Sequence, residues 1–417
     1  MHSRALTLIL ATAVLAGPAA AAAGEAFLES ELLFPLEHWH NHSSSVVELP
    51  NGDLFVAWFH GSGERTADDV VIQGARWIKK TGTWTTPFLL ADTPGFPDTN
   101  CVVYLDSKNR LWLFWPVIVA HRWESALMKY KVSTDYMQAD GPPNWDRSDN
   151  IILIPKNISE RMEEVYGRFA GRPGIGARAS MQVAKANDEF FSRMGWFTRN
   201  HPIELASGRM LVPMYSDGFS NSLMAISDDG GETFYASEPI VGFGNIQPAL
   251  AVRKNGEIVA YMRDAGPPPK RIHMSVSKDD GLTWSTAVDT DLPNPGSSCQ
   301  VMTLRNGLWA LVYNDTERGR HSLAVALSDD EGQTWKWTRH VERDDTEEKP
   351  TTFHYPAMWE AKDGTLHLTY SYFVNSLPLP RDAPRKSIKH AHFNTDWIKQ
   401  GDRDADRGDI WLLERPR

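Results

Sequence analysis

The stretch SDDGGETF at residues 227–234 returns as SKDDGLTW at 277–284 and as SDDEGQTW at 328–335. All three stretches follow the pattern Ser-x-Asp-x-Gly-x-Thr-Trp/Phe, and they are called boxes below. The Ser and Asp side chains can bond to the local backbone, the Gly allows a positive φ, and the aromatic residue can anchor the turn in a core. The boxes therefore predict one turn used three times, and degenerate copies of it end at Trp84 and Trp145.

A second repeat lies between the boxes. Each copy has a polar turn centred on Gly or Asn, followed by a strand with mainly apolar alternation, which is typical of a β-hairpin. The six turn positions are Gly52, Asn109, Gly208, Gly256, Gly307 and Gly364. Six hairpins, five of them followed by a box or its remnant, predict an all-β fold, a six-bladed β-propeller of four-stranded blades. The boxes would join the two outer strands of a blade, and a strand around residues 31–36 would complete the last blade.

The spacing of the turns also locates an insertion. Neighbouring turn positions are 48 to 57 residues apart, except that Asn109 and Gly208 are 99 residues apart. An insertion at about residues 150–196, between blades 2 and 3, explains the long interval, and its sequence favours helices. Long insertions on a rigid scaffold are often functional. We expect a lid or wall beside the site, with a decorative insertion at the outer edge as the alternative.

The first 23 residues have the features of a secretory signal peptide. A short basic start is followed by an apolar run that is too short to span a membrane, and then by small residues up to Ala23. We expect cleavage near Ala23, a secreted or periplasmic protein with no membrane span, and a single domain over residues 24–417.

The amino-acid composition limits the classes of molecule that the protein is expected to bind. The 417-residue chain carries a formal charge of −10, which disfavours nucleic acid as a partner. Its 16 Trp, 17 Phe and 11 Tyr residues suit a sheet core, and a few could stack on sugar rings. The two cysteines, Cys101 and Cys299, fall near the starts of inner strands on opposite sides of the ring, so we expect no disulfide between them.

Polar residues gather where the innermost strands should begin. Side chains at these starts meet at one mouth of the central channel, which is the default ligand site of such a fold. Nine residues before the turn positions lie Ser43, Asn100, Arg199, Gln247, Ser298 and Tyr355, with His42 one step earlier. This set is too polar for positions selected by packing alone.

A second ring of polar residues precedes the third strand of each blade. It includes Asp68 and Asp69 in blade 1, Arg271 in blade 4 and Arg320 in blade 5. Two arginines in adjacent blades suit a carboxylate, which guanidinium groups bind through charge-assisted bonds. The alternative is a pair of surface arginines that cap acidic neighbours. Further candidates for substrate binding are Arg65 and Arg263.

The boxes, the six blades and the two arginines resemble sialidases of the Asp-box superfamily over nearly the whole mature chain. In that family three arginines hold the sugar carboxylate, an Asp is the acid/base, and a Tyr–Glu pair supplies the nucleophile. By motif, Arg271 resembles the second arginine, and Arg320, in GRHSLAVAL, resembles the third. Tyr355, in HYPAM, sits where the family has its nucleophilic tyrosine. Asp68 or Asp69, in GERTADDVVI, would supply the acid.

Two positions depart from the family pattern. His42, in HNHSSSVVELP, stands where the resemblance places the first arginine. Gln247, in NIQPALAV, stands where it places the glutamate that deprotonates the tyrosine, and a glutamine cannot accept that proton. The resemblance therefore implies a divergent relative that acts on an acidic sugar other than ordinary sialic acid.

Three functions stay open. The first is an exo-acting glycoside hydrolase with Tyr355 as nucleophile and an Asp of the 63–72 loop as general acid. The second is a lyase acting on a uronic acid, with Tyr355 and His42 as base and acid. The third is a propeller that binds sugar without turnover. In each case the expected partner is an acidic oligosaccharide or glycoconjugate.

No cofactor and no metal are expected. His38, His40 and His42 alternate along one stretch and would face the same side of a strand, which could suit zinc. We expect His42 to face the mouth without a metal, because the chain offers no second set of ligands beside them.

Overall fold

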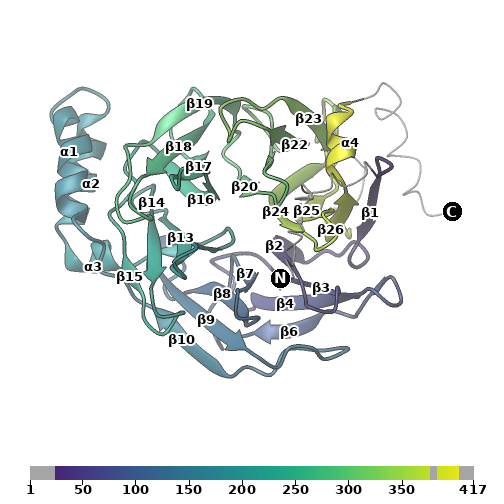
Figure 1. Ribbon diagram of the computed structural model, residues 1–417. Coiled ribbons are helices and arrows are strands. Elements are labelled where there is room, and N and C mark those ends of the chain that lie inside the picture. Colours follow the sequence, from purple (N-terminus) through teal and green to yellow (C-terminus); the bar gives the residue numbers. More distant parts are fainter. Residues whose placement is uncertain (1–23, 376–382, 403–417) are drawn as a thin grey trace, which may run out of the picture.

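The computed structural model describes residues 24–375 and 383–402, so the expected signal peptide lies outside the described residues. Six antiparallel sheets stand around a central axis as blades, which confirms the six-bladed β-propeller (Figure 1). No helix in the described ranges is long and apolar enough to cross a membrane.

Apart from the outermost strand of blade 6, the strands of each blade run outward from the axis in chain order. Blade 1 contains β2 (His40–Glu48), β3 (Leu54–Gly61), β4 (Val71–Ile78), β5 (Thr83–Trp84) and β6 (Phe88–Ala91). Blade 2 contains β7 (Val102–Leu105), β8 (Leu111–Ile118), β9 (Ala126–Ser133) and β10 (Arg147–Ile151). Blade 3 contains β11 (Phe197–Thr198), β12 (Ile203–Glu204), β13 (Met210–Ser216), β14 (Asn221–Ser227) and β15 (Tyr235–Ala236).

The other three blades follow the same plan. Blade 4 contains β16 (Asn245–Val252), β17 (Ile258–Asp264), β18 (Arg271–Ser277) and β19 (Val288–Pro293). Blade 5 contains β20 (Gln300–Thr303), β21 (Trp309–Tyr313), β22 (Ser322–Ser328) and β23 (Trp337–Arg343). Blade 6 contains β24 (Thr352–Glu360), β25 (Leu366–Phe373), β26 (Lys386–Phe393) and, as its outermost strand, β1 (Leu28–Leu32). A short helix, α4 (Thr395–Lys399), follows β26.

The turns between the first and second strands lie where the sequence predicts them. Gly52 has a φ of 86° and Asn109 a φ of 57°, and the other four turn glycines also have positive φ. Glycine and asparagine are the residues that adopt this conformation at least cost. The turns therefore set the register from which positions on the inner strands can be counted.

The three boxes join the third and fourth strands of blades 3, 4 and 5. In the first box, the Asp229 carboxylate accepts hydrogen bonds from the Ser227 hydroxyl and from both the backbone N–H and the hydroxyl of Thr233. The other two boxes repeat these bonds. Gly231 packs directly on the Trp112 indole of the preceding blade, where a Cβ atom would have no room. The box thus fixes a turn and joins two neighbouring blades.

The strand β1 closes the ring, a few residues earlier in the chain than expected. It pairs antiparallel with β26, so that Glu29 lies opposite His392 and Glu31 opposite His390. His367 on β25 lies opposite His392 in turn, and these two rings stack with centroids 4.2 Å apart. Three imidazoles are therefore packed together behind the closing strand, with Lys79 and Asp363 as further charged neighbours.

Because of this histidine cluster, we expect the free energy of unfolding to decrease at acidic pH. Burial, followed by the charges of His390, His392 and Lys79, lowers the pKa of His367. The unfolded chain therefore binds more protons, and stability is lost as the pH falls below about 6.5, by about 1.4 kcal/mol per pH unit for one such group. We expect His367→Gln to flatten the dependence of the unfolding free energy on pH, measured by urea denaturation between pH 7 and pH 5. An unchanged slope in His367→Gln would contradict this assignment.

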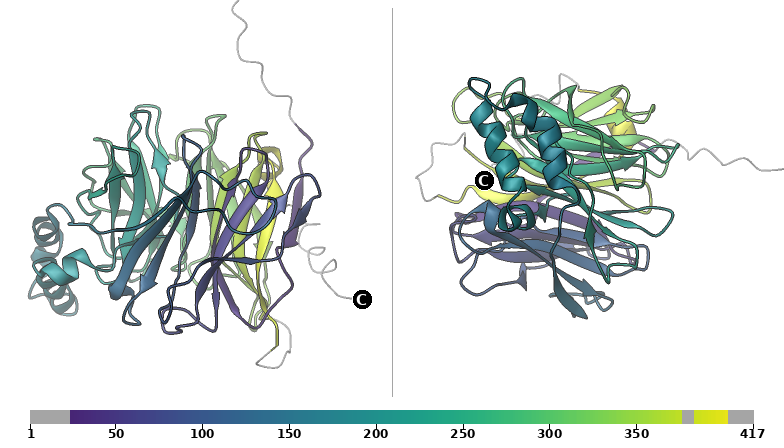
Figure 2. Two further views of the ribbon diagram at one scale, coloured as in Figure 1. Left: turned by 90° about the horizontal axis from the view of Figure 1, so that it is seen from below. Right: turned by 90° about the vertical axis from the view of Figure 1, so that its left-hand side faces the viewer.

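The insertion between blades 2 and 3 is helical, as predicted. It contains α1 (Ile158–Tyr166), the short 3-10 helix η2 (Gly167–Phe169), α2 (Gly176–Ala186) and α3 (Glu189–Arg193). Figures 1 and 2 place these helices on the outer rim of the propeller, so they form no lid over the channel. The hydroxyl of Tyr166 donates to the carbonyl of Gly242, and the rings of Tyr166 and Phe169 both pack on Phe243. The insertion therefore supports the loop that leads into β16.

Cys101 and Cys299 are free and buried, and they lie in separate core clusters. Burial raises the pKa of each thiol to about 12, so neither forms the reactive thiolate near neutral pH. We expect a thiol reagent to modify neither cysteine in the folded protein and both after denaturation. Rapid modification of the native protein would contradict this arrangement.

Candidate active site

Four of the six innermost strands have a residue in the left-handed region at or near their start. The φ angles are 58° at Ser43, 40° at Asn100, 58° at Gln247 and 51° at Tyr355. In β2, β16 and β24 the pairing with the second strand shifts at this point, which marks a β-bulge. Such conformations are costly for non-glycine residues and are concentrated at functional sites, where a bulge redirects a side chain. The same distortion therefore recurs at the positions counted from the sequence.

Tyr355 lies at the centre of the resulting cluster. Its side-chain oxygen accepts a hydrogen bond of 2.8 Å from Arg263 Nη1 and one of 3.2 Å from Gln247 Nε2. The guanidinium carbons of Arg199, Arg320 and Arg263 lie 5.1, 5.3 and 6.0 Å from the centre of its ring. A buried phenol is thus surrounded by three cations and two N–H donors.

The cations decide the protonation of Tyr355. Burial alone would raise the pKa of its hydroxyl, but the charges of Arg263 and Arg320 and the bond from Gln247 outweigh burial and lower the pKa. Opposite charges and donors favour the ionised form of a group. Gln247 therefore stabilises the phenolate as a donor, although it cannot take the proton itself.

A second tyrosine shares the same amide. Gln247 Nε2 and Asn100 Nδ2 each donate to the Tyr215 oxygen at 3.1 Å. Burial, together with the charges of Asp217 and Tyr355, raises the pKa of Tyr215 well above its usual value. The site thus holds one tyrosine that favours the phenolate and one that stays a phenol.

His42 packs on Tyr355 as a neutral ring. The two ring centroids are 4.4 Å apart, and His42 Nδ1 shares a hydrogen bond of 2.8 Å with the Ser371 hydroxyl. Burial, reinforced by the charges of His40 and His354, lowers the pKa of His42 well below its usual value. The position that the resemblance assigns to an arginine therefore contributes no positive charge here.

Two arginines also hold the surrounding backbone. Arg199 Nη2 donates to the carbonyl oxygens of Tyr355 and Pro356, which fixes the bulge in β24. Arg320 Nη2 donates to the Gly296 carbonyl at 2.8 Å, and Arg320 Nη1 lies 2.8 Å from His354 Nδ1. Arg199 is thus a buried support, and Arg320 is the arginine that also faces other charged groups of the site.

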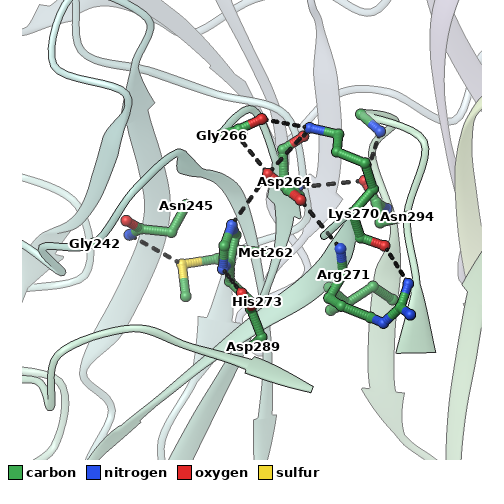
Figure 3. Close-up of polar contacts among 12 residues, drawn as sticks. Gly242, Asn245, Met262, Asp264, Gly266, Lys270, Arg271, His273, Asp289 and Asn294 are labelled. Atoms are coloured by element: carbon green, nitrogen blue, oxygen red, sulfur yellow. Dashed lines mark hydrogen bonds and ion pairs between the residues drawn. The ribbon is translucent and has the colours of Figure 1, made fainter. Parts of the chain in front are cut away.

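The network around Asp264 fixes the end of β17, where Asp264 directly follows Arg263 in the chain. Figure 3 shows this network. Asp264 accepts from the backbone N–H groups of Gly266 at 2.6 Å and Arg271 at 3.1 Å, and it pairs with Lys270 at 3.2 Å. The guanidinium of Arg271 instead bonds the Lys270 carbonyl and pairs with Glu317. Arg263, rather than Arg271, therefore accompanies Arg320 beside Tyr355.

The acidic residues of the 63–72 loop point in different directions. Asp68 bonds His121 at 2.6 Å and Asp69 bonds the Ser62 hydroxyl at 2.8 Å, both at exposed positions. Glu64 instead accepts a 3.0 Å bond from His40, whose other ring nitrogen lies 3.2 Å from Lys386 Nζ. Burial would raise the pKa of Glu64, but His40, Arg65 and Arg320 outweigh it and lower the pKa. Glu64 is therefore the carboxylate of this loop that lies near the cationic cluster.

Asp217 is a second carboxyl at the site. It directly follows β13, two residues after Tyr215. Burial, with a contribution from Glu124, raises the pKa of Asp217 to about 6, although Arg263 and Arg65 oppose the shift. Arg65 itself lies over the Trp123 ring, with the guanidinium carbon 5.4 Å from the centroid.

Tyr215, Asp217 and Glu64 are not among the residues singled out from the sequence. Counting seven residues forward from the turn positions would have identified Tyr215. For four of the turns this count gives Tyr215, Arg263, Asn314 and Ser371. These polar residues end the second strands at the same mouth. Asp217 and Glu64 lie in loops beyond the periodic pattern, where no count applies.

The histidine stretch of blade 1 is used within the site. His40 bonds Glu64 and His42 bonds Ser371. Among residues 24–375 and 383–402, no group of three or more His, Cys, Asp or Glu side chains is arranged to hold a metal ion.

The family model of the BNR repeat-like domain matches residues 52–153 and 181–368, more than half of the chain. The chain therefore belongs to the BNR repeat-like domain family. No curated protein sequence matches it.

Solved structures share the fold at low identity. A protein of unknown function from Dyadobacter fermentans superimposes with a TM-score of 0.63 at 16% identity, covering 88% of this chain and 98% of its own. The NanB sialidase of Streptococcus pneumoniae gives 0.64 at 12% identity, covering 88% and 71%. The intramolecular trans-sialidase of Ruminococcus gnavus gives 0.62 at 14% identity, covering 86% and 95%. At these identities the likeness is one of fold.

Proposed function

We propose that the protein is an exo-acting glycoside hydrolase for an acidic sugar, with Tyr355 as its nucleophile. The observation that carries the proposal is the environment of the Tyr355 oxygen, which Arg263 and Gln247 bond at 2.8 and 3.2 Å within a ring of three guanidinium groups. A phenol held this way is activated for attack without a neighbouring base.

The cationic cluster supports an acidic substrate. Arg263 uses one bond for Tyr355, and its buried Nε has no partner among the described residues. Arg320 and Lys386 add positive charge on the other flank, and guanidinium groups bind carboxylates through charge-assisted bonds. Because His42 is neutral where the resemblance places the first arginine, the carboxylate would have a clamp unlike that of sialidases, which argues for a sugar other than ordinary sialic acid.

The reaction would take two steps. The Tyr355 oxygen forms a bond to the anomeric carbon while the bond from that carbon to the glycosidic oxygen breaks, and the departing oxygen takes a proton from an acid. Water then attacks the anomeric carbon and releases Tyr355. The activated oxygen supplies the nucleophile, and the arginines stabilise the charges that develop.

Elimination is the second candidate, and Gln247 favours it. A lyase needs a base for the proton beside the carboxylate, and Tyr355 with its lowered pKa would act as that base without a glutamate partner. The neutral His42 cannot donate a proton near neutral pH, so the acid would have to come from another group.

A screen against acidic oligosaccharides, followed by mass spectrometry and ultraviolet absorbance, separates these functions. Hydrolysis adds the mass of water and gives no new absorbance. Elimination leaves the summed mass unchanged and creates an absorbing unsaturated product. Saturable binding with neither change would identify a sugar-binding propeller.

Export of the protein is a further proposal, based on residues 1–23, which have the features of a secretory signal peptide. Mass analysis of the secreted protein for cleavage near Ala23 tests it.

A further inference from the structure

We propose that Asp217, rather than an acidic residue of the 63–72 loop, donates the proton to the departing glycosidic oxygen; this inference rests on the proposed hydrolytic function. The hydrolytic reaction requires a general acid, and the proposal assigns this role to Asp217. The resemblance to sialidases implied Asp68 or Asp69 instead. Two observations carry it: the position of Asp217 in the fold, with the charges around it, and its contrast with Glu64.

The first observation is position. Asp217 follows the strand that carries Tyr215, and Tyr215 is joined to Tyr355 through the single amide of Gln247. The charged groups that face Asp217 come from four blades: Arg263 from blade 4, Glu124 from blade 2, Arg65 from blade 1, and the phenol of Tyr215 from its own blade. From the insertion, Lys185 Nζ bonds the carbonyl of Gly218 next to it. Asp217 thus lies at the end of β13, beside the Tyr215–Gln247–Tyr355 network.

The second observation is the contrast between the two carboxyl groups, Asp217 and Glu64. Glu64 bonds His40 and faces Arg320, and these partners keep it ionised. Asp217 makes no side-chain hydrogen bond among the described residues, and burial holds part of its population neutral near pH 6. Where environments push the pKa values of two carboxyls apart, the one with the raised pKa is suited to donate and the other to remain an anion.

The chemistry balances with this assignment. As the glycosidic bond breaks, its electron pair moves to the departing oxygen, and the Asp217 proton forms the new O–H bond. Asp217 becomes a carboxylate, which the charges of Arg263 and Arg65 then stabilise. When water attacks the tyrosyl intermediate, the same carboxylate accepts the proton of the water and is restored.

The test compares the variants Asp217→Asn and Glu64→Gln. Each variant is assayed on a methyl glycoside and a 4-nitrophenyl glycoside of the same sugar. The pair of glycosides is made once with N-acetylneuraminic acid and once with glucuronic acid. Methoxide needs protonation and 4-nitrophenolate does not. Because Asp217 would also act in the second step, which both glycosides share, the readout is kcat/KM, which reports departure of the leaving group. We expect Asp217→Asn to lower kcat/KM about 100-fold or more on the methyl glycoside and less than about tenfold on the 4-nitrophenyl glycoside. Its pH profile should lose the limb near pH 6, and Asp217→Glu should restore part of the rate.

A second readout does not need turnover. Carbon-13 NMR of aspartate-labelled protein should show one carboxyl with a midpoint near pH 6 that disappears in Asp217→Asn. The proposal is overturned if Asp217 titrates near 4, or if Asp217→Asn loses the same factor on both glycosides while Glu64→Gln shows the leaving-group dependence. If the carboxyl titrates near pH 6 while the wild type hydrolyses neither sugar and no acidic oligosaccharide of the screen, the proposed function itself has failed.

Discussion

Replacing Tyr355 with phenylalanine should reduce turnover about 100-fold or more, which is within the range for a lost nucleophile or base. The change removes one oxygen atom and leaves the ring that stacks on His42 and faces Arg199. The fold should therefore remain intact, as shown by an unchanged melting curve. The measurement is kcat on the acidic glycoside identified by the screen.

Tyr235→Phe is the matched control. This tyrosine is exposed, and its hydroxyl bonds Asp228 of a box turn. It should keep full activity. An independent readout is the ultraviolet signal of tyrosinate, in which one ionisation below the usual pKa should be lost in Tyr355→Phe only. A fully active Tyr355→Phe enzyme would place the chemistry elsewhere.

Arg320→Ala should weaken binding of the acidic ligand by about 2 kcal/mol, or roughly 30-fold, because a charge-assisted partner is lost. Calorimetry on the Tyr355→Phe background measures binding without turnover. Arg320 lies between the Tyr355 ring and the His40–Glu64 pair, so its removal should also raise the pKa of Tyr355.

Arg271→Ala provides the contrast, since the sequence pairs it with Arg320 whereas its guanidinium is tied to Glu317 and the Lys270 carbonyl. We expect less than about a threefold change in affinity from this variant, as for an exposed ion pair. Equal losses of affinity in Arg271→Ala and Arg320→Ala would instead support the expectation from the sequence that these two arginines bind one carboxylate together. A ligand preference for neutral sugars would exclude the acidic clamp.

The sequence predicts the architecture well because the architecture is periodic. Turn glycines and box residues are local requirements, fixed by φ angles and by bonds within eight residues, so they can be counted. The same count reaches Gln247 and Tyr355, which the structure brings within 3.2 Å of each other. The constant spacing of nine residues between these inner-strand positions and the turns carries the register from one end of the blade to the other.

The details of the site depend on features that have no period. The bulges at the strand starts and the loops beyond them decide that Arg263 reaches Tyr355 while Arg271 turns to Glu317. Whether Glu64 or Asp68 faces the mouth depends on the path of one short loop. The protonation of Asp217 depends on its burial and on the charges of Arg263, Glu124 and Arg65, which come from three other blades. None of these properties is encoded in a local pattern.

The closing strand has a consequence for the order of folding. Tyr355 and His354 belong to the one blade whose outermost strand comes from the beginning of the chain, with Leu28 paired to Phe393. A ribosome must therefore synthesise more than 360 residues after β1 before that blade can be completed. Contacts so distant in sequence form slowly. The reactive tyrosine should thus acquire its arginine neighbours only in the last stage of folding, so an incompletely folded chain would be inert toward glycosides.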